Sequence, residues 1–324
     1  MTTSLDPRAL LPDVAGDAVS LPRDRRGPAP QSAAVMLLAS YALAPRAWIG
    51  SATLVALLTD LGTTTAGARA VVSRLSRRGV LEGRKDGRAT SYRLADAAAV
   101  SLARGGRAIA SFAAQAQTWD GRWTLVAFSV PQDADAARAT LRARLRWRGF
   151  VPLYDGLWVS PDPPGAALYA ALADAVADAP GTTCSAFRAE EVPVPAGRQR
   201  TARDLWDLES VRADYEEFLR RWRPVADAVA AGQAPHGAQA LRARIGVEED
   251  YRRFVVLDPR LPLAELPEGW PRTEALGVFT AVFDGLLEPG LAHLRETAAR
   301  CGQDASALRG HTLAQLAAGL DPHG

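Results

Sequence analysis

Between residues 63 and 94, the apolar positions change from a helical to a strand spacing. Four of them recur at i, i+3, i+4 and i+7, which predicts a helix from about Thr65 to Arg78 with one apolar face: Ala68, Val71, Val72 and Leu75. Thr63, Thr64 or Thr65 can cap the start of this helix, and Gly79 can take the left-handed conformation that ends it.

Two strand-like runs follow, from Val80 to Arg84 and from Thr90 to Leu94, and the pair Asp86-Gly87 between them is a strong hairpin signal. A helix followed by a hairpin forms the second half of a winged helix-turn-helix. Upstream, a buried helix capped by Ser32 and a second helix from Ser51 to Leu61 are expected to complete the domain.

Charge is concentrated in the same stretch. Residues 62–93 carry eight basic side chains against two acidic ones, whereas the whole chain has a net charge of only +2. Such a field suits the phosphate backbone of double-stranded DNA. A bare basic helix can equally be a solvated face, but a hairpin with Lys85 and Arg88 at its tip favours DNA. The residues expected to contact DNA are Thr64, Thr65, Arg69, Ser73, Arg74, Arg77, Arg84, Lys85 and Arg88.

A second domain is indicated by the order of the elements in the middle of the chain. The pattern predicts strand, helix, strand, strand, helix and strand, which is the order of a ferredoxin-like split βαβ fold. The predicted ranges are Trp123 to Val130, Asp133 to Arg148, Phe150 to Tyr154, Leu157 to Ser160, Gly165 to Ala179 and Thr182 to Arg188.

The carboxy-terminal part is predicted to be helical. An apolar seam marks its first helix, which Pro224 is expected to end: Leu208, Val211, Tyr215, Phe218 and Trp222. This seam can form a dimer contact or pack within its own domain. Further helices are predicted at 238–256, 273–287 and 289–300, and the prolines between Leu257 and Pro271 predict an irregular segment there.

The length of 324 residues indicates several domains in an α+β protein. We expect a flexible leader at 1–30, a winged helix-turn-helix at 31–96, a helical linker at 97–118 with a break at Gly105-Gly106, a ferredoxin-like middle domain at 119–195 and a helical domain at 198–324.

Two distant cysteines and four scattered histidines predict neither a disulfide framework nor a metal site. No stretch approaches the apolar length of a membrane span, so we expect a cytoplasmic protein without a membrane partner.

Several short motifs, taken in order, resemble the PaaX-like transcriptional repressors over nearly the whole chain after residue 31. They are Tyr41-Ala-Leu-Ala-Pro45, Trp48-Ile-Gly-Ser51, the stretch from Ala68 to Leu75, Trp119-Asp-Gly-Arg-Trp123, Leu145-Arg-Trp-Arg-Gly-Phe150, Gly156-Leu-Trp-Val-Ser-Pro161, Leu257-Asp-Pro-Arg-Leu-Pro262 and Leu266-Pro-Glu-Gly-Trp-Pro271. The resemblance implies a homodimeric repressor with a winged helix, a middle domain like the small CRISPR-associated ferredoxin-like nucleases, and a helical carboxy-terminal domain.

The resemblance also implies a small-molecule effector, such as an acyl-CoA or aryl-CoA thioester, that releases the repressor from DNA. This chain departs from the family where a histidine usually precedes an aromatic-Arg pair, since its run here is Glu248-Glu-Asp-Tyr-Arg-Arg-Phe254. A CoA pocket needs arginines for the phosphates and flat rings for stacking. Two groups offer these, although such residues are also common in cores: Trp119, Arg122, Trp123, Arg148 and Trp158, and separately Tyr251, Arg252 and Trp270.

Two other functions compete with DNA binding. A nuclease would need a metal-binding aspartate at the end of the first middle-domain strand, but Ser129 and Val130 stand there. The chain also lacks a P-loop, a dinucleotide fingerprint and a nucleophile elbow, so we expect neither an enzyme nor a cofactor. A winged helix that binds another protein is the remaining alternative, and the basic hairpin tip argues against it.

Overall fold

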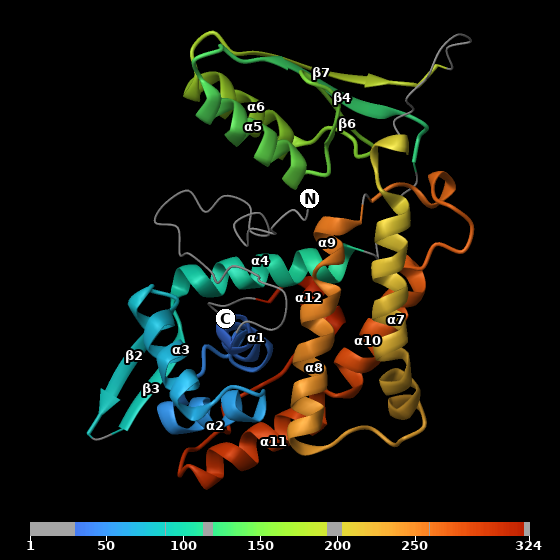
Figure 1. The fold of residues 1–324 in the computed structure, drawn as a ribbon. Helices are drawn as coiled ribbons and strands as arrows, with labels where there is room; N and C mark the ends of the chain where they lie inside the picture. Colours follow the sequence, from blue (N-terminus) through green and yellow to red (C-terminus); the bar gives the residue numbers. More distant parts are fainter. Residues whose placement is uncertain (1–29, 88, 113–118, 193–202, 259, 321–324) are drawn as a thin grey trace. The chain divides into compact units, whose positions relative to one another are not determined.

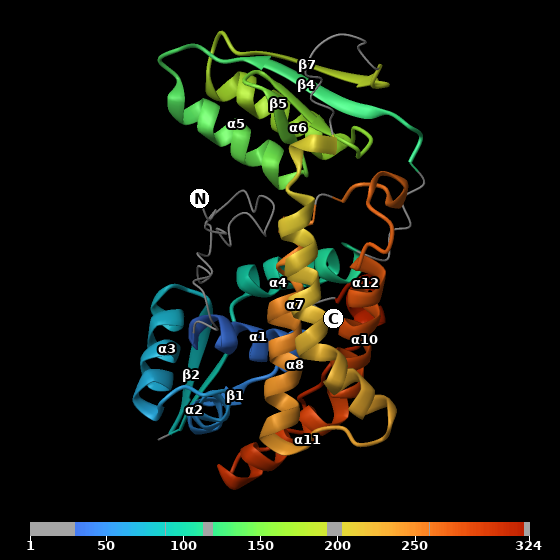
Figure 2. The same cartoon turned by 45° about the vertical axis from the view of Figure 1, so that its right-hand side comes forward.

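The computed structural model describes residues 30–320 apart from 88, 113–118, 193–202 and 259. The chain divides into two compact units (Figures 1 and 2). The larger unit contains residues 1–115, 215–255 and 271–324, and the smaller unit contains residues 116–214 and 256–270. The expected leader, apart from Pro30, lies outside the described residues.

The amino-terminal part of the larger unit contains helices and a three-stranded antiparallel sheet with strand order β1-β3-β2. Its elements are α1 (Pro30–Ala42), β1 (Ile49–Gly50), α2 (Ser51–Asp60), α3 (Thr65–Arg77), β2 (Leu81–Asp86), β3 (Ala89–Leu94) and α4 (Asp96–Phe112). The predicted helix after residue 64 is confirmed as α3. Of the three threonines that could cap it, Thr64 does so, since its hydroxyl accepts a hydrogen bond from the amide of Gly67 at 3.1 Å. Gly79 has a φ of 69°, as the predicted helix end requires.

Three local predictions need correction. The hairpin turn lies one residue later than expected, because Asp86 still pairs with Ala89 in the β2–β3 ladder. Helix α1 begins at Pro30, so Ser32 lies inside the helix instead of capping it. Helix α4 continues through Gly105-Gly106 without a break. A Cβ at Gly106 would lie 2.8 Å from Leu316 of α12, so this glycine permits close packing of two helices.

Further helices follow in the carboxy-terminal region of the chain. They are α7 (Leu208–Ala230), α8 (Gly237–Tyr251), α9 (Phe254–Leu257), α10 (Arg272–Gly285), α11 (Leu287–Arg300) and α12 (Leu313–Ala318). Short 3₁₀ turns occur at η2 (Arg203–Leu205) and η3 (Leu263–Glu265). Leu241 and Leu294 belong to the same hydrophobic core as Leu37, Leu54 and Val72, so α8 and α11 share one core with α1, α2 and α3.

Pro224 does not end α7, contrary to the prediction. A proline removes one hydrogen bond from a helix, yet side chains on both sides of it are buried, among them Trp222 and Ala226. The seam also packs within its own chain, since Tyr215 stacks on Phe254 with ring centroids 3.9 Å apart. The buried seam therefore gives no support for a dimer contact along α7.

One helical stretch in the described part of the chain, Arg272–Arg300, is long and apolar enough to cross a membrane, which corrects the expectation that no segment approaches that length. Its mean hydropathy reaches 1.3, and 39% of that window is buried inside the protein. The stretch consists of α10 and α11, in which Phe279 and Leu294 have no exposed surface. Core helices of globular proteins have the same composition.

The smaller unit contains a four-stranded antiparallel sheet with strand order β5-β6-β4-β7. Its elements are β4 (Trp123–Ser129), α5 (Asp135–Trp147), β5 (Val151–Tyr154), β6 (Leu157–Ser160), α6 (Ala166–Asp178) and β7 (Thr183–Ala189). Both helices lie on the same face of the sheet (Figure 1), and their side chains Leu141, Leu145 and Leu168 pack in one core with Val126 and Trp158. The predicted order of six elements is confirmed.

Candidate nucleic-acid interface

Helix α3 has a fully buried face and a fully exposed one. Ala68, Val71, Val72 and Leu75 fill the core, as their spacing predicted. The predicted contact residues on the opposite face are all exposed: Thr64, Thr65, Arg69, Ser73, Arg74 and Arg77. The same helix that anchors the domain therefore presents three guanidinium groups and two threonines to solvent.

The hairpin extends this surface. Arg84 and Lys85 of β2 are exposed, while Arg88 lies outside the described residues. Strand β2 has two acidic residues, Glu82 and Asp86. Glu82 forms an ion pair with Arg93, and its Oε1 lies 3.7 Å from the Nη2 of Arg46. In the described part of the chain, no ion pair within the protein involves Arg69, Arg74, Arg77, Arg84 or Lys85. These cations remain available for an external anion.

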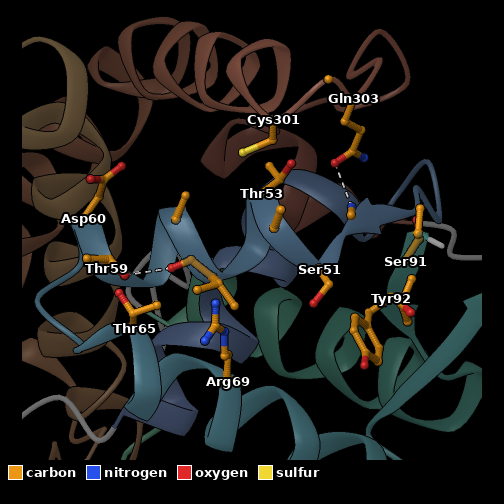
Figure 3. Close-up of a pocket in the computed structure, with 17 residues that line it drawn as sticks. Ser51, Thr53, Thr59, Asp60, Thr65, Arg69, Ser91, Tyr92, Cys301 and Gln303 are labelled. Carbon is orange, nitrogen blue, oxygen red and sulfur yellow. Dashed lines mark hydrogen bonds between the residues drawn. The ribbon is translucent and has the colours of Figure 1, made fainter.

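A groove of about 860 Å³ lies between α2, the start of α3, strand β3 and the turn after α11 (Figure 3). Arg69 is the positive charge on its wall. Seven other lining residues carry a hydroxyl group: Ser51, Thr53, Thr59, Thr65, Thr90, Ser91 and Tyr92. Hydroxyls and arginines are the side chains that commonly contact the sugar-phosphate backbone of DNA.

The sequence did not indicate most of this groove. Ser51 directly follows strand β1 and Ser91 lies within strand β3, and no motif around either serine marks it as a contact residue. The turn at Cys301–Gln303 lies more than two hundred residues away from them along the chain. Thr65 and Arg69, at the start of α3, are the groove residues that the sequence did predict as contacts.

The end of helix α2 is fixed by two side chains from the carboxy-terminal helices. Arg242 of α8 donates to the carbonyl oxygen of Asp60 from Nε at 3.1 Å and from Nη2 at 2.5 Å. The Nε2 atom of His293 on α11 lies 2.8 Å from the Asp60 carboxylate. A cation at the carboxyl end of a helix is favourable, so these contacts stabilise α2 in its place beside α3.

The first group of effector candidates lies in the smaller unit. Trp158 is a core residue with 1% exposure, and Trp123 is buried against Trp206, with ring centroids 6.0 Å apart. Arg122 is exposed and pairs with Glu190 at 3.4 Å. Trp119 and Arg148 are half-buried. The two buried tryptophans therefore have a core role in this conformation, which leaves the exposed Arg122 and the half-buried Trp119 and Arg148 as the accessible members.

The second group divides between the two units. Tyr251 is fully buried and stacks on Phe279 at a centroid distance of 4.1 Å. Arg252 is half-buried and donates to the Ser32 hydroxyl of α1 at 3.0 Å. In the smaller unit, Trp270 is buried, and its ring lies 5.4 Å from the Arg212 guanidinium.

Comparisons with known proteins agree across the chain. Three family models match it: PaaX-like protein at residues 29–98, PaaX protein central Cas2-like domain at residues 116–200, and PaaX-like protein C-terminal domain at residues 206–296. The transcriptional repressor PaaX of Escherichia coli (strain K12) is 28% identical over 257 residues, which are 77% of each chain. A solved structure, uncharacterized protein Rv0674 from Mycobacterium tuberculosis, is similar in fold, with a TM-score of 0.51 and 24% identity over 80% of this chain and 95% of that one.

Proposed function

Because the chain belongs to the PaaX-like family, we propose that it is a transcriptional repressor that binds double-stranded DNA through α3 and the β2–β3 hairpin. The order α1, β1, α2, α3, β2, β3 supports a winged helix-turn-helix, with the hairpin as its wing. The observation that carries the proposal is a set of exposed cations on α3 and the wing that form no ion pair among the described residues: Arg69, Arg74, Arg77, Arg84 and Lys85.

Homology to a repressor supports a regulator and not an enzyme. The strand order β5-β6-β4-β7, with both helices on one face, supports a ferredoxin-like fold for the smaller unit. We assign this unit a structural or regulatory role, since its β4 strand ends at Ser129, where the nucleases of that fold carry a metal-binding aspartate.

Replacement of Arg69 by alanine is expected to weaken operator binding by about 1 to 3 kcal/mol and to relax base discrimination, because Arg69 lies on the first turns of the recognition helix and can reach a guanine edge. Lys85→Ala should instead weaken binding to all duplexes alike, because a lysine at the wing meets phosphates. The operator is first located by footprinting on the DNA upstream of the protein's own gene. Gel-shift titrations on this operator and on a scrambled duplex then measure both effects. Arg220→Ala, an exposed arginine on α7, is the control; unchanged affinity in both test variants would contradict the winged-helix assignment.

A homodimer is expected from the two-half-site logic of repressors, although the α7 seam is not its basis. Sedimentation equilibrium of the full chain should give twice the chain mass of 34.5 kDa. The same measurement with operator duplex should give two chains per duplex. A single chain that binds one duplex with full affinity would rule the dimer out.

An acyl-CoA or aryl-CoA effector is expected to lower operator affinity by the roughly 1 to 3 kcal/mol typical of allosteric coupling. Calorimetry with phenylacetyl-CoA, repeated on Arg122→Ala and Arg252→Ala, separates the two candidate sites. Arg252→Ala also removes the bond to Ser32, so Ser32→Ala is its matched control. If no thioester gives heat or releases DNA, the effector proposal fails while the DNA proposal stands.

A further inference from the structure

We propose that Gln303, in the turn after α11, is a positioning residue for the wing: it holds Trp48 in place, and Trp48 fixes Arg84 in position for a DNA phosphate. This inference rests on the proposed function, because it concerns how the wing binds DNA. It assigns a role in DNA binding to a residue of the carboxy-terminal helical region.

The side-chain amide of Gln303 bonds strand β1 as a neighbouring strand would. Its Nε2 donates to the carbonyl oxygen of Trp48 at 2.9 Å, and its Oε1 accepts from the amide of Gly50 at 2.7 Å. The other edge of β1 pairs with β3, where Ile49 is opposite Tyr92. Strand β1 is therefore bonded on both edges, with a glutamine side chain in place of a third strand.

Gly50 is suited to this close approach. A Cβ there would lie only 2.9 Å from the Gln303 Oε1, so any larger residue would push the amide away. The turn itself is fixed on α11, because the amide of Gln303 donates to the carbonyl oxygen of Ala298 at 2.9 Å. The turn that carries Gln303 is thus fixed by the end of α11, and Figure 3 shows the Gln303 side chain bonded to strand β1.

Two arginines of the wing lie over the Trp48 ring. The Arg84 guanidinium lies 4.7 Å from its centroid, and that of Arg93 lies 4.6 Å from it. Arg93 is also neutralised by Glu82, whereas Arg84 has no acidic partner in the described part of the chain. A cation over an indole face keeps its charge and its hydrogen-bond donors. Arg84 is therefore restrained and still able to bind a phosphate.

Restraint of this kind favours binding, because a free arginine loses rotamer entropy when it meets a phosphate. If Gln303 acts in this way, its effect on DNA must pass through Arg84. A residue that only stabilises the fold would affect every DNA contact alike. A double-mutant cycle separates these two roles.

The experiment measures operator affinity of the full chain for Gln303→Ala, alone and combined with Arg84→Ala or Arg74→Ala. We expect Gln303→Ala alone to weaken binding about two- to fivefold, the size of an exposed cation–π contact. In the Arg84→Ala background it should add nothing. In the Arg74→Ala background it should keep its full effect, because Arg74 lies on α3 and does not contact Trp48.

A second series keeps the test informative if Gln303→Ala unfolds. Trp48→Phe retains an aromatic face and should preserve more affinity than Trp48→Ala, with the difference abolished by Arg84→Ala. An equal effect of Gln303→Ala in both backgrounds, or no effect in the wild-type chain, would overturn the inference. If neither Arg74→Ala nor Arg84→Ala changes DNA affinity, the proposed function itself fails.

Discussion

Replacing Arg244 by methionine is expected to lower the free energy of unfolding by about 3 to 5 kcal/mol, the usual cost of removing one partner from a buried charged network. Arg244 of α8 has no exposed surface. Its Nε donates to the carbonyl oxygen of Phe283 at 2.9 Å, and its Nη2 donates to that of His311 at 2.6 Å. The substitution would leave two buried carbonyl groups without donors.

The same substitution would remove the positive charge of Arg244, which lies near the carboxyl group of Glu248. Burial raises the pKa of this carboxyl, while Arg244 and a hydrogen bond from Ser40 oppose the rise. Ser40 lies on α1, so the network joins the first helix of the proposed DNA-binding part to α8. Its loss should therefore loosen the support of α1 as well as the helical core.

Urea denaturation at neutral pH measures the effect of Arg244→Met. Arg242→Met on the same helix is the control, because Arg242 is exposed and its hydrogen bonds to Asp60 should contribute only about 1 kcal/mol. A loss for Arg244→Met no larger than that of the control would contradict the view that this buried guanidinium supports the fold.

The elements that the sequence predicted well are those governed by local chemistry. Helix α3 begins and ends as predicted because a threonine cap, an apolar face and a left-handed glycine all lie within fifteen residues of one another. The hairpin turn was misplaced by one residue because Asp86 can stand either in the turn or in the strand. The prediction that α7 ends at Pro224 was wrong, because the packing of side chains on both sides of this proline outweighs the loss of one helical hydrogen bond.

Contacts between distant parts of the chain could not be predicted from one sequence. Gln303 and Gly50 are 253 positions apart, and Arg242 and Asp60 are 182 apart. Neither pair has a local pattern. Arg244 is one of two arginines in α8, and its neighbours in the sequence give no sign that it, and not Arg242, is buried. Aromatic residues suggest a ligand pocket or a core equally well, which is why Trp158 and Tyr251 were candidates for an effector site.

Acid is expected to destabilise the protein through His311, whose imidazole is buried with 4% exposure. Burial, and secondarily the positive charge of Arg244, lower the pKa of His311 from 6.5 to about 3. In the unfolded chain this histidine takes up a proton below about pH 6.5, whereas in the folded chain it stays neutral. Above pH 6.5, His311 therefore does not reduce the free energy of unfolding. Below it, the free energy of unfolding decreases progressively as the pH falls toward 3.

The difference between the pKa of 6.5 for the unfolded chain and of about 3 for the folded chain corresponds to roughly 4 to 5 kcal/mol of unfolding free energy, since each pKa unit is worth about 1.4 kcal/mol. Between pH 7.5 and pH 4.5 the wild-type chain should lose about 2 to 3 kcal/mol from this residue alone. Urea denaturation at both values, on the wild-type chain and on His311→Gln, isolates the contribution, because the carboxyl groups that also titrate are common to both. His236→Gln, which changes an exposed histidine, should retain the wild-type loss. Equal losses in the wild-type chain and in His311→Gln would show that the buried imidazole does not couple folding to pH.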